Sequence, residues 1–233
     1  MDYANNNSIL GTIFIAKHEI TNNLIEVEEM AINLQKGQRV DLTKGNPGLT
    51  KITVGLGWDP VEAKGGGGLF GGLFGGSSGG ANVDCDASVI MLGDQDKLRN
   101  KNDVVYFGNL KSGDGSVHHS GDNLTGHGDG DDEQIVIELN RIPSTIQKLV
   151  FVVNIYDCVK RKQHFGMIRN AFIRVVNSSN NQEMIKYNLT DDYNGKTSLV
   201  VGEIYRHGTE WKFAAVGTGT NAAGLSEVVR SYS

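Results

Sequence analysis

The chain is poor in the residues that mark several protein classes. It has 3 prolines and 2 cysteines among 233 residues, and no run of 18 apolar residues. The two cysteines, Cys85 and Cys158, cannot build a disulfide framework, so we expect two buried, reduced thiols. Without a long apolar run we expect no transmembrane helix and no stable insertion into a membrane.

Positive charge is also scarce. There are 22 Lys and Arg residues against 27 Asp and Glu, a formal net charge of -5. This balance argues against nucleic acid as a partner, which normally requires a basic surface. No Lys or Arg precedes the short apolar run at 9–16, and no small-residue cleavage site follows it. A secretory signal is therefore not expected, and we predict a cytoplasmic protein.

Glycine is abundant, with 31 residues, and 10 of them lie within 65–80. Such a stretch loses too much backbone entropy to form regular structure, so we interpret 64–80 as a flexible loop. Its two Leu-Phe pairs, at 69–70 and 73–74, either pack on their own domain or contact a partner or membrane. Residues 1–29 differ from the rest, and we interpret them as an N-terminal extension that is disordered or a non-native start.

From residue 30 onward, apolar residues alternate with polar ones or glycine, which is typical of half-buried strands. The expected strands lie at 52–58, 87–92, 104–107, 135–139, 149–155, 171–176, 184–189, 198–205 and 211–216. The strand at 149–155 is apolar on both faces, as in the centre of a sheet. Helix is expected only at the C-terminus, with Asn221 as its N-cap. The pattern predicts an all-β protein: one domain, 30–233, forming a β-sandwich of two mostly antiparallel sheets with a short C-terminal helix.

The negative charge is concentrated in one loop. Residues 120–133 read S-G-D-N-L-T-G-H-G-D-G-D-D-E and carry a formal charge of -5, so the rest of the chain sums to zero. These carboxylates repel one another unless they are solvated or share a cation. Neutral oxygens and glycine turns among them suit calcium, which takes 6 to 8 oxygen ligands at about 2.3–2.6 Å. A solvated hairpin connection remains the alternative.

Two further acidic sites favour the metal interpretation. Asp84 and Asp86 flank Cys85 where a strand begins, and Asp59 follows a strand that ends at Trp58. Loops from different strands converge at one end of a sandwich, so we expect a site for two or more calcium ions. The residues expected around these ions are Asp59, Asp84, Asp86, Asp122, Asn123, Thr125, Gly126, Gly128, Asp129, Asp131, Asp132 and Glu133.

The same segments carry a resemblance to a known family. The motifs L-x-K-G at 34–37, G-L-G-W-D at 55–59 and D-x-D-A-S at 84–88 resemble those of the TerD family of bacterial tellurium-resistance and general-stress proteins. The most specific is G-D-N-L-T-G at 121–126 followed by G-x-G-D-D-E at 128–133. The glycine-rich loop is similar to that of members near the TerZ branch. The resemblance implies a calcium-binding β-sandwich that acts in resistance to tellurite and other chemical stress with membrane-associated stress-complex proteins. From the residues themselves we expect no enzyme.

Two alternatives belong to other classes. A calcium-dependent membrane adaptor would use the Leu-Phe pairs to contact lipid. A metal-dependent hydrolase would need a positioned base or nucleophile. His118 and His119 would point to opposite faces of a strand, so only one could join the acidic end, and we interpret them as a surface pair. We find no reaction to propose.

Overall fold

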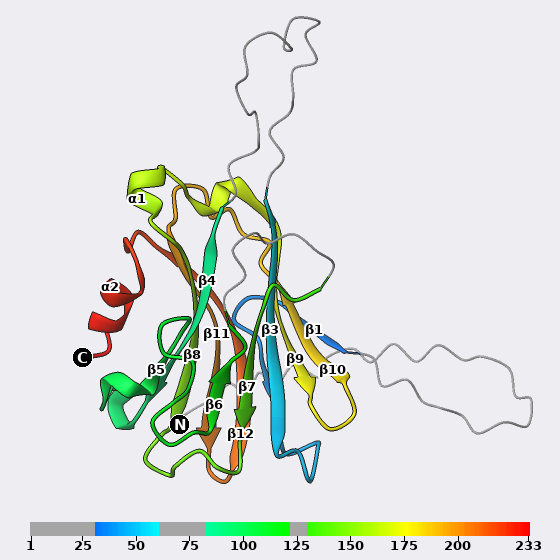
Figure 1. The fold of residues 1–233 in the computed structure, drawn as a ribbon. Helices are drawn as coiled ribbons and strands as arrows, with labels where there is room; N and C mark the ends of the chain where they lie inside the picture. The colour runs from blue at the N-terminus through cyan, green and yellow to red at the C-terminus, as the bar shows by residue number, and fades with distance from the viewer. Residues whose placement is uncertain (1–30, 61–82, 122–129) are drawn as a thin grey trace, which may run out of the picture.

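The computed structural model describes residues 31–60, 83–121 and 130–233. Within these ranges the chain forms two six-stranded sheets packed face to face, with two short α-helices (Figure 1). The first sheet has the order β1 (Ile32–Leu34), β10 (Gln182–Asn188), β9 (Ile168–Asn177), β3 (Lys51–Pro60), β7 (Glu133–Glu138) and β6 (Val117–His119). The second has the order β2 (Arg39–Asp41), β12 (Glu210–Thr220), β11 (Ser198–His207), β8 (Lys148–Ile155), β4 (Cys85–Leu92) and β5 (Val104–Val105).

Neighbouring strands in the described ranges are antiparallel except β1, which runs parallel to β10. The helices are α1 (Cys158–Arg161) and α2 (Leu225–Arg230), and three short 3-10 turns lie at Asp94–Asp96, Lys101–Asp103 and Phe165–Met167. The prediction of an all-β sandwich with a short C-terminal helix is confirmed.

The core between the sheets follows the alternation of the strands. On β3, Ile52, Val54, Leu56 and Trp58 face inward and are buried. The central strand β8 is buried on both faces, as predicted. Its odd-numbered residues, such as Phe151, join the core between the sheets, whereas Val150 and Val152 join a second cluster beneath α2.

The start of the C-terminal helix was predicted wrongly. Gly224, not Asn221, occupies the N-cap position of α2. The Asn221 side chain instead accepts a hydrogen bond from Lys196 Nζ at 3.3 Å. β12 ends at Thr220, and residues 221–224 lead from the end of this strand to the outer face of the second sheet, where α2 packs.

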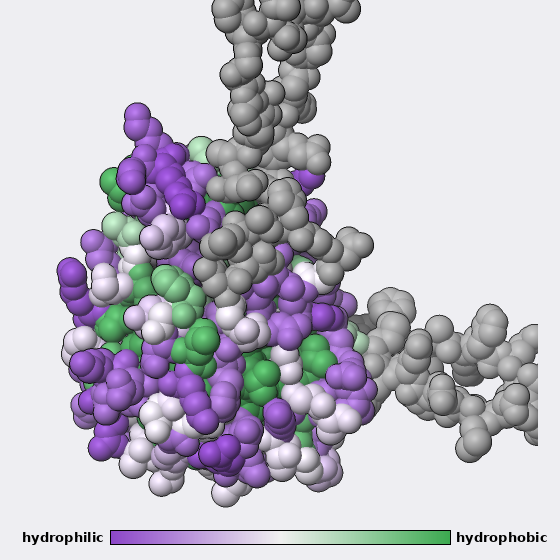
Figure 2. All heavy atoms as spheres, viewed as in Figure 1, coloured by the Kyte–Doolittle hydropathy of each residue, from purple (hydrophilic) through white to green (hydrophobic). Residues whose placement is uncertain are grey.

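The face of the molecule shown in Figure 2 is largely polar in its described part. Hydrophilic residues dominate this face, and hydrophobic ones appear there in small separate groups.

Both cysteines are buried and unpaired, which confirms the prediction of reduced thiols. No helix in the described part of the chain is long and apolar enough to cross a membrane.

Candidate metal site at one end of the sandwich

The end of β3 and the start of β4 lie at the upper end of the molecule in Figure 1. The start of β7 lies a few residues lower along β3. In the first sheet Leu56 lies opposite Glu133, and in the second Asp86 lies opposite Asn154. Every expected ligand within the described ranges lies at this end: Asp59, Asp84, Asp86, Asp131, Asp132 and Glu133. The others, Asp122, Asn123, Thr125, Gly126, Gly128 and Asp129, lie outside the described residues.

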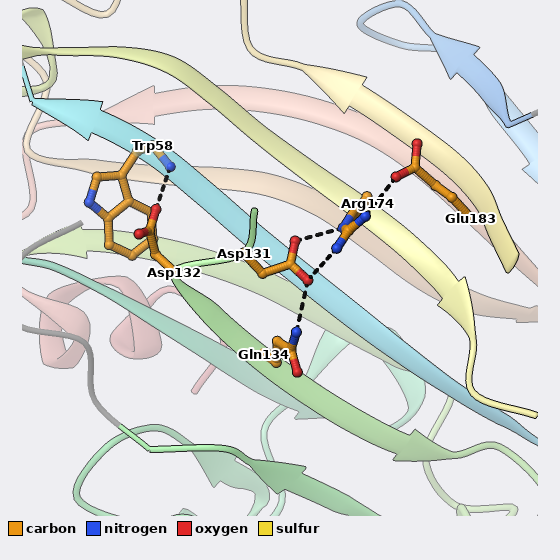
Figure 3. A network of polar contacts seen from close by, with 6 residues as sticks. All are labelled: Trp58, Asp131, Asp132, Gln134, Arg174 and Glu183. Carbon is orange, nitrogen blue, oxygen red and sulfur yellow. Dashed lines mark hydrogen bonds and ion pairs between the residues drawn. The ribbon is translucent and has the colours of Figure 1, made fainter. Parts of the chain in front are cut away.

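Asp131 lies on the outer face of the first sheet, in a network of polar contacts (Figure 3). Arg174 donates to both of its oxygens, with Nε–Oδ1 at 2.6 Å and Nη2–Oδ2 at 3.0 Å. Gln134 Nε2 donates to Oδ2 at 3.0 Å, and Arg174 also binds Glu183 at 2.9 Å. The hydrogen bonds that Arg174 donates to Asp131 raise the pKa of Arg174, so the guanidinium stays charged.

Gly55 makes room for this network. It lies between Arg174 on β9 and Gln134 on β7 in the strand register. A Cβ atom on Gly55 would come within 2.2 Å of the Asp131 carboxylate. The Asp131 side chain therefore occupies the space that a side chain at residue 55 would fill.

Asp132 is held differently. Its Oδ2 accepts the backbone N–H of Trp58 at 2.7 Å (Figure 3). The pKa of Asp132 is nevertheless raised, chiefly by partial burial and then by the charges of Asp59, Glu133 and Asp131. The hydrogen bond from Trp58 is thus insufficient to offset desolvation and repulsion, which disfavour the charged form.

Glu133 is buried and joins the two sheets. Its Oε2 accepts the backbone N–H of Ala87 on β4 at 2.6 Å. His119 Nε2 lies 3.1 Å from the carbonyl oxygen of Ala87 and 3.3 Å from Glu133 Oε2. Because His119 Nδ1 accepts the N–H of Gly121, a neutral ring carries its proton on Nε2 and donates it to these oxygens. We call Glu133 and His119 the sheet clamp.

The sheet clamp completes the hydrogen bonding of a buried part of β4 that β5 does not pair with. The neighbouring strand β5 pairs only with Val89 and Ile90 of β4. The N–H and C=O of Ala87 therefore lie beyond the end of β5, and side chains from the opposite sheet bind them instead. An unpaired backbone group buried here would cost free energy comparable to a lost hydrogen bond.

Asp84 and Asp86, at the start of β4, contact α1 and the neighbouring strand β8. Arg161 Nη1 lies 3.2 Å from Asp84 Oδ2, and Asn154 Nδ2 lies 3.3 Å from Asp86 Oδ2. Cys85 lies between them, fully buried in the core. Its pKa is raised well above the usual value by burial, and then by the charges of Asp86, Asp84, Glu133 and Asp132. The thiol is therefore neutral and shielded, as expected for a buried spacer.

The carboxylates gather at one end but do not all face one point. Asp131 binds Arg174 on the outer face, Glu133 reaches the opposite sheet, and Asp59 accepts Asn170 Nδ2 at 2.6 Å. Among the described residues, no group of three or more His, Cys, Asp or Glu side chains is placed to hold a metal ion. Asp131, Asp132 and Glu133 are the described carboxylates nearest in sequence to the remaining expected ligands.

Sequence reasoning missed three residues of this end. The interpretation of His118 and His119 as a surface pair was wrong for His119, whose side chain is fully buried. The expectation that the two side chains point to opposite faces was right, because the His118 side chain is not buried with His119 and contacts the carbonyl oxygen of Gly115 at 3.1 Å. Arg174 and Arg161 were not singled out as ion-pair partners. Arg174 lies three residues after Ala171 in a predicted strand, so strand alternation could have predicted that its side chain points outward. Alternation could not have predicted that Asp131 is its partner.

Comparison with known proteins gives the family. The model of the TerD domain matches residues 30–232. The chain belongs to the TerD family. It is 64% identical over 203 residues to stress response protein SCP2 of Bacillus subtilis (strain 168), covering 87% of this chain and all of that protein. It is 43% identical over 203 residues to the tellurium resistance protein TerD of Serratia marcescens, covering 87% of this chain and 97% of that one.

A solved structure supports the fold. The crystal structure of a homologue of telluride resistance protein (TerD) from Streptomyces coelicolor A3(2) superposes with a TM-score of 0.53 at 22% sequence identity. The match covers 75% of this chain and 92% of that one. At this identity the likeness concerns the TerD-family fold alone.

Proposed function

We propose that this TerD-family protein binds two or more calcium ions at the acidic end of its sandwich and acts in the cytoplasmic response to tellurite and other chemical stress. The stress role is supported by relatives named for stress response and tellurium resistance. We assign the protein no catalysed reaction, and propose that it works with membrane-associated stress-complex proteins.

The repulsion around Asp132 is the observation that carries the calcium proposal. Partial burial raises its pKa most, and the charges of three neighbouring carboxylates raise it further, even though Trp58 donates a hydrogen bond to it. A bound cation would reverse the sign of this interaction and stabilise every carboxylate in its charged form. Hard oxygen donors without a neighbouring thiolate suit calcium better than zinc.

The residues fit such an ion by their chemistry. Asp132 and Glu133 each accept a backbone N–H through one carboxylate oxygen, and carboxylate oxygens are the ligands that calcium takes. These oxygens, with the expected ligands from 122–129, would supply the negative charge that calcium neutralises. Arg174 holds Asp131, and therefore the chain leading into β7, against the outer face of the sheet.

The experiment is a thermal unfolding series of the full chain in calcium, magnesium or chelator. At a hundredfold excess over the dissociation constant, calcium should stabilise the fold by about 2.7 kcal/mol, which raises Tm by roughly 5–10 °C. Asp132→Asn should reduce the shift. Glu138→Gln, at the far end of the strand β7 that follows Asp132, should leave the calcium-induced shift intact. An equal Tm in all three solutions would contradict the proposal.

A further inference from the structure

A cleft of about 540 Å³ lies on the outer face of the first sheet, beside the acidic end. It is formed by β3, β9, β10 and the residues that follow β10. Trp58, Asp59, Asn170, Phe172, Lys186 and Asn188 are among the residues that line it. This volume is within the range of about 300–1,000 Å³ that is typical of small-molecule sites.

The floor of the cleft depends on Gly57. In the strand register Gly57 lies opposite Phe172, which lies opposite Asn188. A Cβ atom on Gly57 would come within 2.4 Å of the Phe172 ring and 2.7 Å of the Gly130 carbonyl oxygen. The missing side chain therefore lets the ring lie against β3 and brings a carbonyl oxygen to the cleft.

Two opposite charges line the cleft without pairing. Lys186 Nζ lies 4.5 Å from the centroid of the Phe172 ring, and it forms no ion pair with any described residue. The Asp59 carboxylate accepts Asn170 Nδ2 and likewise has no cationic partner in the described ranges. The contact with the aromatic ring holds the ammonium in place while leaving it able to bind an anion.

The backbone is irregular where Asp59 is positioned. The pairing of β3 with β9 shifts register between Gly57 and Asp59, which is a bulge. Asn170 has a φ of 54°, a left-handed conformation that asparagine tolerates better than most residues. Bulges of this kind re-aim side chains, and strained backbone gathers at binding sites.

We propose that this cleft binds a small zwitterion, a compound of about dipeptide size that carries both an ammonium and a carboxylate. The ammonium group pairs with Asp59 and the Gly130 carbonyl oxygen. The carboxylate pairs with Lys186 and the Asn188 amide. A simple anion is disfavoured by Asp59 and a simple cation by Lys186, whereas a zwitterion satisfies both charges.

The test titrates L-alanyl-L-alanine into the ¹⁵N-labelled full chain and follows amide shifts by NMR, in calcium and in chelator. We expect shifts at Asp59, Phe172 and Asn188. N-acetylation, which removes the ammonium, and C-terminal amidation, which removes the carboxylate, should each weaken binding tenfold or more. Equal binding of the acetylated or the amidated dipeptide would overturn the proposal, as would the absence of shifts with the unmodified dipeptide.

The proposed zwitterion site and the proposed calcium site share Asp59. Lys186 belongs to the zwitterion site alone, so a substitution of Lys186 distinguishes the two. Lys186→Met removes the ammonium but keeps a long apolar side chain, and should weaken dipeptide binding tenfold or more. Lys51→Met, on an exposed part of the same sheet, should bind like the wild type. Wild-type affinity in Lys186→Met would overturn the zwitterion site. The calcium-induced Tm shift of that variant reports on the calcium proposal independently.

Discussion

Glycine at residue 55 is a requirement of the acidic end rather than a sign of flexibility. Arg174 and Gln134 flank it on the neighbouring strands, and the Asp131 carboxylate lies above it. The half-buried ion pair depends on the geometry of both partners, since a displaced carboxylate would leave Arg174 without its bidentate partner.

Gly55→Ala should therefore destabilise the protein. The new Cβ would lie within 2.2 Å of the carboxylate of Asp131 and force it away from Arg174. We expect the free energy of unfolding to fall by about 1–3 kcal/mol in urea titrations, the usual cost of overpacking. Gly45→Ala is the matched control, because nothing lies within 4 Å of its Cβ position. Equal stability of the two variants would contradict this account of Gly55.

Asp132 gives the metal-free protein a defined pH dependence. Its pKa is raised above the ordinary value of 3.8 in the folded protein, so the folded state binds its proton more tightly than the unfolded state. Stability contributed by this group is present at low pH and is lost as the pH rises through the folded pKa. In chelator at pH 7, the charged carboxylate therefore destabilises the fold.

Asp132→Asn should raise the Tm of the calcium-free protein at pH 7 by a few degrees, and the gain should vanish as the pH falls toward 4. Asparagine can still accept the Trp58 N–H, so the hydrogen bond survives. Glu138→Gln is the control with the opposite sign, because its hydrogen bond from Arg141 lowers the Glu138 pKa. Thermal melts across pH 4–8 measure both. A lower Tm for Asp132→Asn at pH 7 would contradict the repulsion argument.

At the scale of the elements, the long strands could be predicted and the short ones could not. The alternation in 52–58 and 149–155 is long enough to reveal β3 and β8. Strands β1, β2 and β6 have three residues each, too few to display a period of two. They exist because neighbouring strands offer hydrogen-bonding edges, a tertiary effect that a local pattern cannot contain.

The candidate site was foreseen in its location and charge but not in its contacts. In the sequence, residues 131–133 form one uninterrupted acidic group. The structure separates it, because Asp131 precedes β7 and faces Arg174 on the outer face, while Glu133, the first residue of β7, enters between the sheets. His119 illustrates the limit, since two adjacent histidines do not indicate which of them faces inward. Such partners are fixed by cross-strand register, which depends on residues far away in the chain.

The sheet clamp gives a prediction for strand β4. Glu133 accepts the Ala87 N–H at the uncovered edge, so Glu133→Ala should expose that amide to exchange. The Ser88 N–H points the other way, toward β8, by the alternation of antiparallel strands. In hydrogen exchange followed by NMR, the exchange rate of the Ala87 amide should rise roughly 10- to 100-fold more than that of the Ser88 amide. Equal acceleration of both amides would indicate global destabilisation and contradict the clamp.

The whole molecule has three layers where the C-terminal helix covers the second sheet. Val228 of α2 is buried against a cluster that includes Ile90, Val150, Val152 and Val200 on the outer face of that sheet. These residues explain why β8 is apolar on both faces. Without α2, that outer face would expose a contiguous apolar surface, which promotes aggregation.

Val228→Asp should therefore destabilise the whole fold and promote association. A carboxylate replacing Val228 would be buried among apolar side chains, at a cost of about 2–4 kcal/mol, which lowers Tm by roughly 5–15 °C. Ser226→Asp places the same charge on the exposed side of the same helix and should change Tm by no more than a degree or two. Thermal melts and light scattering distinguish the outcomes. If the two variants melt together and stay monodisperse, α2 contributes little to the fold, and its contact with the second sheet is not what keeps that face from associating.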